Sequence, residues 1–224
     1  MSNIDSHASI NVSEHIKISD PENNRVIIDK NMSSNNMGFM SNINVQGFVK
    51  IYDTETKEVL LEKKNAVNFE NMSVAIAKSL SSVTTGNLYN MAFGNGGTTV
   101  NSTGDITYMT PNTSGTNASL YNQTYLKTNI AGVGLSYDPL NNIEVNHTGR
   151  TTYSDIIITT TLGYSEPSDQ NAFDNNTGTD KYTFSEIGLL SQDNKLLTHV
   201  IFSPTAKALN RIITIEYTLR IALV

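Results

Sequence analysis

Cysteine and tryptophan are absent from the 224 residues, and long apolar runs are absent too. Without cysteine the chain forms neither disulfides nor thiolate sites for metals or redox chemistry. No stretch approaches the roughly 18 apolar residues that suggest a membrane span. The first residues lack the basic segment and apolar core of a signal peptide. We therefore expect a protein that is made in a cytoplasm and does not enter a membrane.

Charged residues are also scarce, at 16% of the chain, against about 25% in typical globular proteins. The net charge is −6 and the 15 Lys and Arg residues form no long run, which argues against nucleic-acid binding as the main task. Asn, Ser and Thr fill the balance, and they favour turns and strand surfaces. Because uncharged polar groups cost less to bury than ions, this composition suits a protein covered by neighbours.

The C-terminal stretch 211–224 alternates strictly between apolar and polar residues. One face carries Ile213, Ile215, Tyr217, Leu219, Ile221 and Leu223. The other carries Thr214, Glu216, Thr218 and Arg220. A period of two predicts a long strand with one face on a core.

Other segments predict a mainly β protein with one helix. Residues 45–64 and 182–202 each look like a hairpin, the second stopped by Pro204, and 153–164 is a β-branched central strand. The helix is predicted at 68–83, with Asn68 as its N-cap and an apolar stripe at spacings of three and four. The stripe consists of Phe69, Met72, Ile76, Leu80 and Val83.

These elements predict an antiparallel β-sandwich or barrel with one packed α-helix (about 68–83) and an extended N-terminal arm. We divide the chain into the polar arm, 1–44, and a β-rich structural domain, 45–224. A long surface excursion, 101–150, belongs to the domain, and long loops are often contact-making.

The arm and the excursion supply the interface candidates. Composition alone allows the arm to be a flexible tail, but we expect it to embrace a partner chain or a neighbour in a homo-oligomer. Its candidates are the apolar residues Ile10, Val12, Ile16, Ile18, Val26 and Ile28. In the excursion the candidates are Tyr108, Tyr121, Tyr125 and Tyr137, because tyrosine is enriched at interfaces. The alternative is that these tyrosines cap the edge of the core.

The glycine-rich stretch 94–97 does not predict a phosphate loop. Such a loop needs Lys and Ser/Thr after the glycines and then a helix. Here Thr98, Thr99 and Val100 follow, which favour a strand. We expect a tight turn in which the glycines adopt positive φ.

No catalytic or metal site is predicted. His199 lies in an apolar strand and is expected to be a hydrogen-bonded structural residue, and His147 lies in a loop. The acidic loop 165–181 lacks the spacing of a calcium-binding EF-hand. Paired carboxylates for glycoside cleavage remain possible in principle, because their separation is spatial. We expect no enzyme activity, no cofactor and no small-molecule substrate.

Four segments together resemble virion structural proteins of tailed, myovirus-like bacteriophages. They are 64–80 (KNAVNFENMSVAIAKSL), 91–98 (MAFGNGGT), 119–125 (SLYNQTY) and 184–204 (FSEIGLLSQDNKLLTHVIFSP). The last of these, with YTLRI at 217–221, also looks like the collar-type domains that attach fibres to phage tails. The likeness covers about 45–224 and leaves out the arm.

The resemblance implies a structural subunit of the particle, located in the virion, with other virion proteins as partners. Neck or collar, tail, baseplate and capsid decoration all remain open. The alternative from another class is a host-receptor or glycan-binding module of a tail fibre. A receptor-binding module should bind cells or sugars by itself, whereas a scaffold subunit should not.

Overall fold

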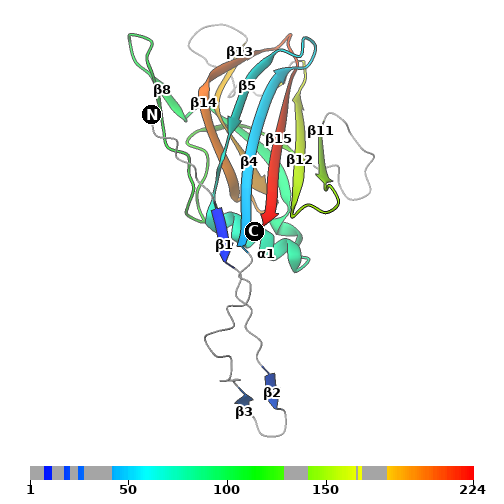
Figure 1. Ribbon diagram of the computed structural model, residues 1–224. Coiled ribbons are helices and arrows are strands. Elements are labelled where there is room, and N and C mark those ends of the chain that lie inside the picture. The colour runs from blue at the N-terminus through cyan, green and yellow to red at the C-terminus, as the bar shows by residue number, and fades with distance from the viewer. Residues whose placement is uncertain are drawn as a thin grey trace.

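A computed structural model describes residues 8–11, 18–20, 25–27, 42–128, 141–164, 166–167 and 181–224. It confirms the predicted fold class, because these described residues form a two-layer antiparallel β-sandwich with one α-helix (Figure 1). No helix in the described ranges is long and apolar enough to cross a membrane.

The first sheet contains six strands. They are β1 (Ala8–Asn11), β4 (Asn42–Asp53), β5 (Val59–Lys64), β11 (Asn141–Asn146), β12 (Tyr153–Leu162) and β15 (Ile213–Leu223). Their order is β1-β4-β15-β12-β11, and β5 also pairs with β4. The predicted hairpin at 45–64 is thus β4 and β5, with β4 starting three residues earlier than expected.

The second sheet contains five strands. They are β6 (Ala66–Val67), β7 (Leu88–Gly94), β10 (Gln123–Thr128), β13 (Lys181–Ser191) and β14 (Leu196–Ala208), in the order β10-β7-β13-β14-β6. Two small hairpins lie outside both sheets: β2 (Ile18–Asp20) with β3 (Arg25–Ile27), and β8 (Thr98–Val100) with β9 (Ile106–Tyr108).

The C-terminal strand β15 is central, as predicted. It pairs along its length with β4 on one side and β12 on the other. Its apolar face is buried from Ile213 to Leu219, but Leu223 is 55% exposed. The predicted buried face therefore ends before the strand does.

A chain of hydrogen bonds fastens the two sheets to each other through Tyr217. Asn65, between β5 and β6, donates its Nδ2–H to the Tyr217 hydroxyl. That hydroxyl donates to Thr198 Oγ1 in the second sheet at 2.7 Å. Gly47 leaves space for the Asn65 side chain, because a Cβ at position 47 would lie 1.8 Å from Asn65 Oδ1.

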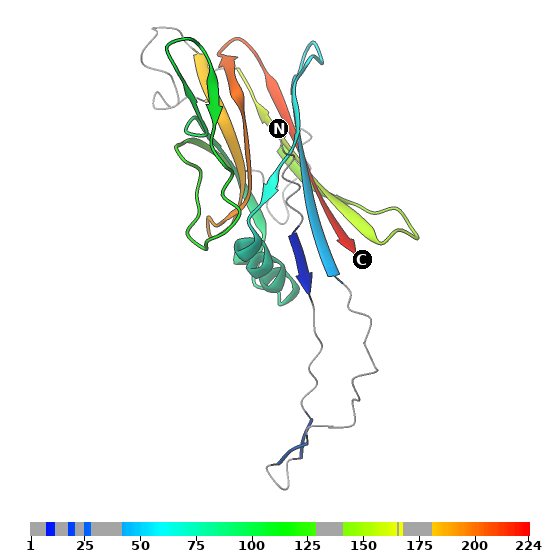
Figure 2. The same cartoon turned by 60° about the vertical axis from the view of Figure 1, so that its left-hand side comes forward.

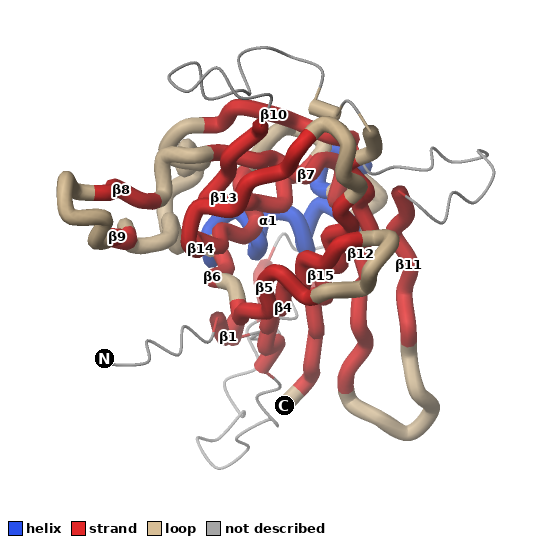
Figure 3. Tube along the Cα trace, turned by 90° about the horizontal axis from the view of Figure 1, so that it is seen from above, coloured by secondary structure: helices blue, strands red, loops and turns tan. Residues whose placement is uncertain are grey.

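The helix α1 (Phe69–Leu80) is capped as predicted, with Asn68 Oδ1 accepting from the Asn71 amide at 3.0 Å. A short 3-10 helix, η1 (Thr84–Gly86), follows it. Seen from above, α1 lies between the two sheets (Figure 3), and Figure 1 places it at the lower end of the sandwich. Met72 is buried there, but Phe69, Leu80 and Val83 are exposed. The predicted stripe is therefore buried only in part, because a helix at the end of a sandwich meets the core with only part of its apolar face.

Pro204 does not stop β14, which runs on to Ala208. The pairing with β13 shifts between Phe184 and Glu186, so that residues 202–204 stand opposite Ser185 alone. A bulge is one of the few places where a sheet accepts proline, because the ladder is locally interrupted.

The glycines at 94–97 do not adopt the positive φ that we expected; the positive-φ glycines of the described residues are Gly104 and Gly115. Close approach explains Gly94 and Gly96 instead. A Cβ on Gly94 would lie 2.4 Å from the Asn122 carbonyl oxygen, and one on Gly96 2.6 Å from the Asn122 amide nitrogen.

Candidate functional site

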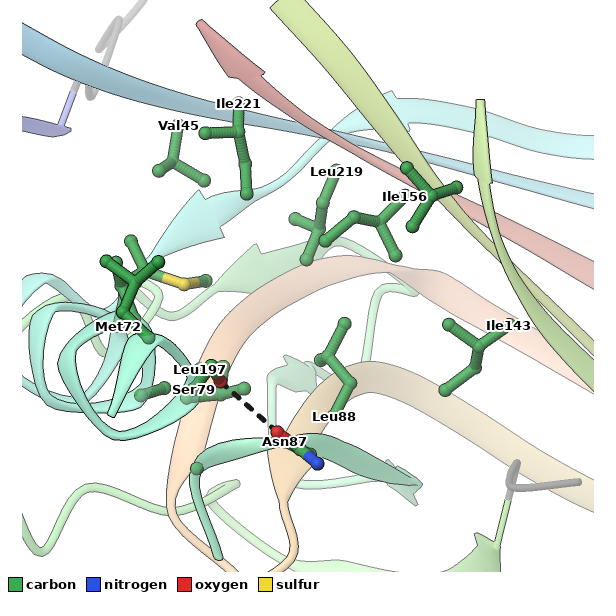
Figure 4. A pocket seen from close by; sticks show the side chains of 15 residues that line it. Val45, Met72, Ser79, Asn87, Leu88, Ile143, Ile156, Leu197, Leu219 and Ile221 are labelled. Carbon is green, nitrogen blue, oxygen red and sulfur yellow. Dashed lines mark hydrogen bonds between the residues drawn. The ribbon is translucent and has the colours of Figure 1, made fainter. Parts of the chain in front are cut away.

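The strongest candidate site is a cleft of about 390 Å³ between the first sheet and α1, which we call the apolar cleft (Figure 4). One wall is the inner face of the first sheet, with Val45, Ile143, Val145, Ile156, Leu219 and Ile221. The facing wall comes from α1, η1, β7 and β14, with Met72, Ala75, Ile76, Leu80, Leu88 and Leu197. The two sheets thus leave an apolar space where α1 enters between them.

Polar side chains are few in the apolar cleft. Ser79 and Asn87 line it, and the Ser79 hydroxyl donates to Asn87 Oδ1 at 3.2 Å, so they satisfy each other. At the rim Leu80 is 82% exposed and Val145 is 71% exposed. A contiguous apolar surface of this kind, unlike a single exposed residue, marks an interaction site.

The N-terminal arm joins the body beside the apolar cleft. β1 pairs with the start of β4, with Ala8 opposite the cleft residue Val45. At the same end the Asn42 and Val224 backbones exchange hydrogen bonds of 2.7 and 2.9 Å. The arm root, the chain end and the cleft therefore share one end of the sandwich.

The arm candidates are only partly within the described residues. Ile10 lies in β1 opposite Ile43. Ile18 in β2 is opposite Ile27 of β3, and Val26 is opposite Ser19. Val12, Ile16 and Ile28 lie outside the described ranges, as do Tyr137 and most of the acidic loop 165–181.

The structure separates the described tyrosine candidates. Tyr108 is exposed on β9, with its hydroxyl 2.6 Å from Ser203 Oγ. Tyr121 is 39% exposed and its hydroxyl donates to the Thr110 carbonyl at 2.6 Å. Tyr125 is half-buried on β10 and packs against Phe93 and Tyr182, as in the alternative that it caps the core. None of these three lines the apolar cleft.

Glu186 and His199 form a fully buried pair on β13 and β14, with 3.0 Å between Oε2 and Nε2. The Asn112 amide donates to His199 Nδ1 at 3.0 Å. Because Nδ1 accepts, the ring carries its proton on Nε2 and donates it to Glu186. The imidazole is thus neutral, and the predicted structural role of His199 fits this arrangement.

The Glu186 carboxylate also accepts three backbone hydrogen bonds. Oε1 accepts from the Gly96 and Asn122 amides at 2.9 and 2.8 Å, and Oε2 from the Tyr121 amide at 3.0 Å. Burial raises the pKa of this carboxyl, but the bonds from His199 and the amides outweigh burial and hold the pKa below its ordinary value.

This arrangement, which we call the Glu186 hub, is better suited to holding loops than to catalysis. Both carboxylate oxygens and both ring nitrogens are already engaged, so neither group is free to exchange a proton with a substrate. Its effect is to bind the turn at 94–97 and the loop at 112–122 to the second sheet.

A second polar group, the β10–β12 cluster, links the sheets, because Lys127 of β10 donates to the Thr161 carbonyl of β12 at 2.5 Å. The cluster also contains Tyr125 and Glu166, and its charges act on Lys207 of β14. Lys127 Nζ lies 2.7 and 2.8 Å from the two Glu166 oxygens, and the Tyr125 hydroxyl donates to Oε1 at 2.7 Å. Burial raises the pKa of the Glu166 carboxyl, but the hydrogen bonds that it accepts lower that pKa by more, so the net shift is downward. Lys207 is buried, and burial lowers its pKa to about 8.

No three His, Cys, Asp or Glu side chains gather into a metal site within the described ranges. Comparison with protein-family models, curated proteins and solved structures gives no match. The site therefore has to be interpreted from its own geometry.

Sequence reasoning missed the apolar cleft. Its walls come from eight separate elements, and which elements come together in the fold cannot be predicted from spacing in the sequence. A signal existed in the helix stripe, since Ile76 and Leu80 continue it beyond the buried Met72. Val145 on the edge strand β11 was a second such signal.

Proposed function

We propose that this chain is a structural subunit of a tailed-phage particle, in the neck or collar, tail or baseplate, with no catalytic role. Its task is to hold neighbouring proteins, including copies of itself. The phage assignment is supported by the resemblance of the four segments in 45–224. The assembly role is supported by the apolar cleft and its exposed rim beside the arm root.

The apolar cleft is the observation that carries the assembly role. Burying apolar surface is the main favourable term in protein association, and exposed Leu80 and Val145 leave such surface uncovered in the single chain. The Glu186 hub, by contrast, offers no free group for a reaction.

Native mass and sedimentation of the full chain test the proposal, beside a variant that starts at Asn42. We expect a defined oligomer for the full chain and a smaller species for the variant, with circular dichroism reporting β structure in both. Monomers in both samples would contradict self-assembly. Binding of the monomeric full chain to bacterial cells or glycans would then favour a receptor-binding module.

A further inference from the structure

The turn between β7 and β8 contains the only Asn-Gly pair in the sequence, Asn95-Gly96. An asparagine that precedes glycine is especially prone to spontaneous deamidation. Glycine has no side chain to hinder its own amide nitrogen, and its backbone bends freely toward the asparagine. Asn95 is exposed, so water has access to it. Whether this pair reacts therefore depends on how the turn is held.

Deamidation at this pair is a reaction of the chain with itself. The Gly96 nitrogen loses its proton and attacks Asn95 Cγ, the side-chain nitrogen leaves as ammonia, and a cyclic succinimide forms. Water then opens the ring at one carbonyl to give aspartate, or at the other to give isoaspartate, whose backbone is one carbon longer. The reaction consumes only water and needs no enzyme.

The Glu186 hub occupies the attacking nitrogen. The Gly96 N–H donates to Glu186 Oε1 at 2.9 Å, and Glu186 is fully buried. To attack, the nitrogen has to give up this bond and become an anion beside a buried carboxylate, which the repulsion of like charges disfavours. Asn122 holds the other reactant. Its Nδ2–H donates to Asn95 Oδ1 at 2.6 Å, and its carbonyl accepts from the Asn95 amide at 3.2 Å.

The turn also has no room for a longer backbone. Figure 2 shows the loop that carries Asn122, in green, on the side of the second sheet that faces away from the first sheet. Even a Cβ on Gly96 would lie 2.6 Å from the Asn122 amide nitrogen. The extra carbon of isoaspartate would therefore push Gly96 away from Glu186, so the isoaspartate turn and the intact hub exclude each other.

We propose that Asn95 is a latent deamidation site and that the Glu186 hub determines when it reacts. While the hub is closed, Asn95 persists. When the turn leaves Glu186, Gly96 attacks and Asn95 becomes aspartate or isoaspartate. A chain that carries isoaspartate does not close its hub again. The hub thus protects the covalent structure of the chain as well as its fold, independently of any assembly role.

Peptide mapping by mass spectrometry measures the reaction after incubation in mildly alkaline buffer, with aspartate and isoaspartate separated by chromatography. We expect Asn95 to deamidate at least tenfold more slowly in the folded chain than in the same chain unfolded in urea. Asn95→Gln should lack the product in both samples, because glutamine has to close a larger ring. Equal rates in the folded and unfolded chains would overturn the inference.

Glu186→Ala and Met72→Ala separate the hub from a general loss of stability. Both remove buried side chains, but Met72 lies in α1 and makes no contact with the hub. At equal fractions of folded protein, we expect Asn95 to react at least tenfold faster in Glu186→Ala. Equal rates would show that only global unfolding releases the turn, and would overturn the role of the hub.

Asn122→Ala provides a variant that should fold in any case, because the Asn122 side chain is exposed. It frees the Asn95 side chain while Glu186 still holds Gly96. We expect deamidation a few times faster than in the unmodified chain, with an unchanged urea midpoint. An unchanged rate would contradict the part assigned to Asn122.

Refolding tests whether isoaspartate and the hub exclude each other. Chains converted to isoaspartate in urea are returned to native buffer beside unconverted chains. We expect the converted chains to unfold at a lower urea concentration, whereas Asn95→Asp, which keeps the normal backbone length, should unfold close to the unmodified chain. Equal midpoints for converted and unconverted chains would overturn this exclusion.

Discussion

The Glu186 hub and the apolar cleft are opposite departures from a simple β-sandwich core. In the hub a buried carboxylate accepts four hydrogen bonds and keeps its charge. In the cleft, apolar side chains from two walls face one another across a space of about 390 Å³. The polar atoms of the hub are paired within one chain, whereas the rim of the cleft keeps apolar side chains exposed at Leu80 and Val145.

This difference separates residues that hold the fold from residues that can bind. An unpaired buried charge is strongly destabilising, so the hub can exist only if every partner is present. Apolar surface exposed to water costs far less per residue, and its cost is recovered when a partner covers it. Substitutions in the hub should therefore affect stability, and substitutions at the cleft rim should affect association.

The largest expected effect comes from removing the hub carboxylate. Glu186→Ala leaves three backbone amides and His199 without their acceptor. Each unsatisfied buried donor costs about 1–3 kcal/mol, so the total loss should be at least about 3 kcal/mol. Urea denaturation should show this loss, while Glu216→Ala on the exposed face of β15 should change stability by less than about 0.5 kcal/mol. Similar losses in both variants would contradict the hub.

The pH dependence of the unfolding free energy, compared between the unmodified chain and Glu186→Ala, gives a further check on Glu186. Its folded pKa is lowered, so its contribution is present above the unfolded pKa of about 4.3 and disappears as pH falls through the folded value. Unfolding free energy should therefore drop less steeply between pH 5 and 3 in Glu186→Ala than in the unmodified chain. Parallel curves would show that the carboxylate is not held in its charged form.

Two positions of α1 test the boundary between core and cleft rim. Met72→Ala removes a buried side chain and should cost about 2–4 kcal/mol. Leu80→Ala, eight residues later on the same stripe, should change the stability of the monomer by less than about 0.5 kcal/mol, because the side chain is exposed. Chemical denaturation at low protein concentration measures both, and equal losses would mean that the stripe is packed throughout.

The sequence allowed the regular elements to be predicted, because each depends on local order. Strict alternation identified β15, and Asn68 identified the start of α1. The stripe alone could not show that α1 lies at the end of the sandwich, since periodicity defines a face but not what covers it. Pro204 was misjudged because the bulge that accommodates it depends on the register with β13.

The hub was half visible in the sequence. Glu186 and His199 are polar residues inside apolar strands of one predicted hairpin, which is a sign that each has a buried partner. Their amide donors at Gly96, Tyr121 and Asn122 lie far away in the chain. Such tertiary contacts depend on how loops cross the sheet, and no spacing rule foretells them.

Lys207 is a buried polar group that is less well satisfied than Glu186. Its Nζ donates to the Ala208 carbonyl at 3.3 Å, and its pKa is lowered to about 8. Replacing a poorly paired buried charge with an apolar chain of similar size can be stabilising. Lys207→Met should therefore raise the unfolding free energy at pH 7 by about 1–3 kcal/mol, measured by urea denaturation.

The gain from Lys207→Met should shrink as pH rises. Between the folded pKa of about 8 and the unfolded value of about 10.4, the unfolded chain binds more protons at this lysine, so the stability of the unmodified protein rises. The variant lacks this rise, and the two curves should converge toward pH 10. A difference in unfolding free energy that stays constant with pH would contradict a lowered pKa for Lys207 in the folded protein.

The smallest expected effect comes from Tyr217→Phe, which removes a single buried and hydrogen-bonded hydroxyl. Without the hydroxyl, the Asn65 amide loses its acceptor and Thr198 Oγ1 loses its donor, although the ring still fills the core. Losing such a bond costs about 1–2 kcal/mol, whereas Tyr108→Phe, which removes an exposed hydroxyl, should cost less than about 0.5 kcal/mol. Denaturation midpoints compare the two variants. Equal losses of stability would show that the Tyr217 hydroxyl does not hold the two sheets together. Self-association should be the same in both variants, because neither tyrosine lines the apolar cleft.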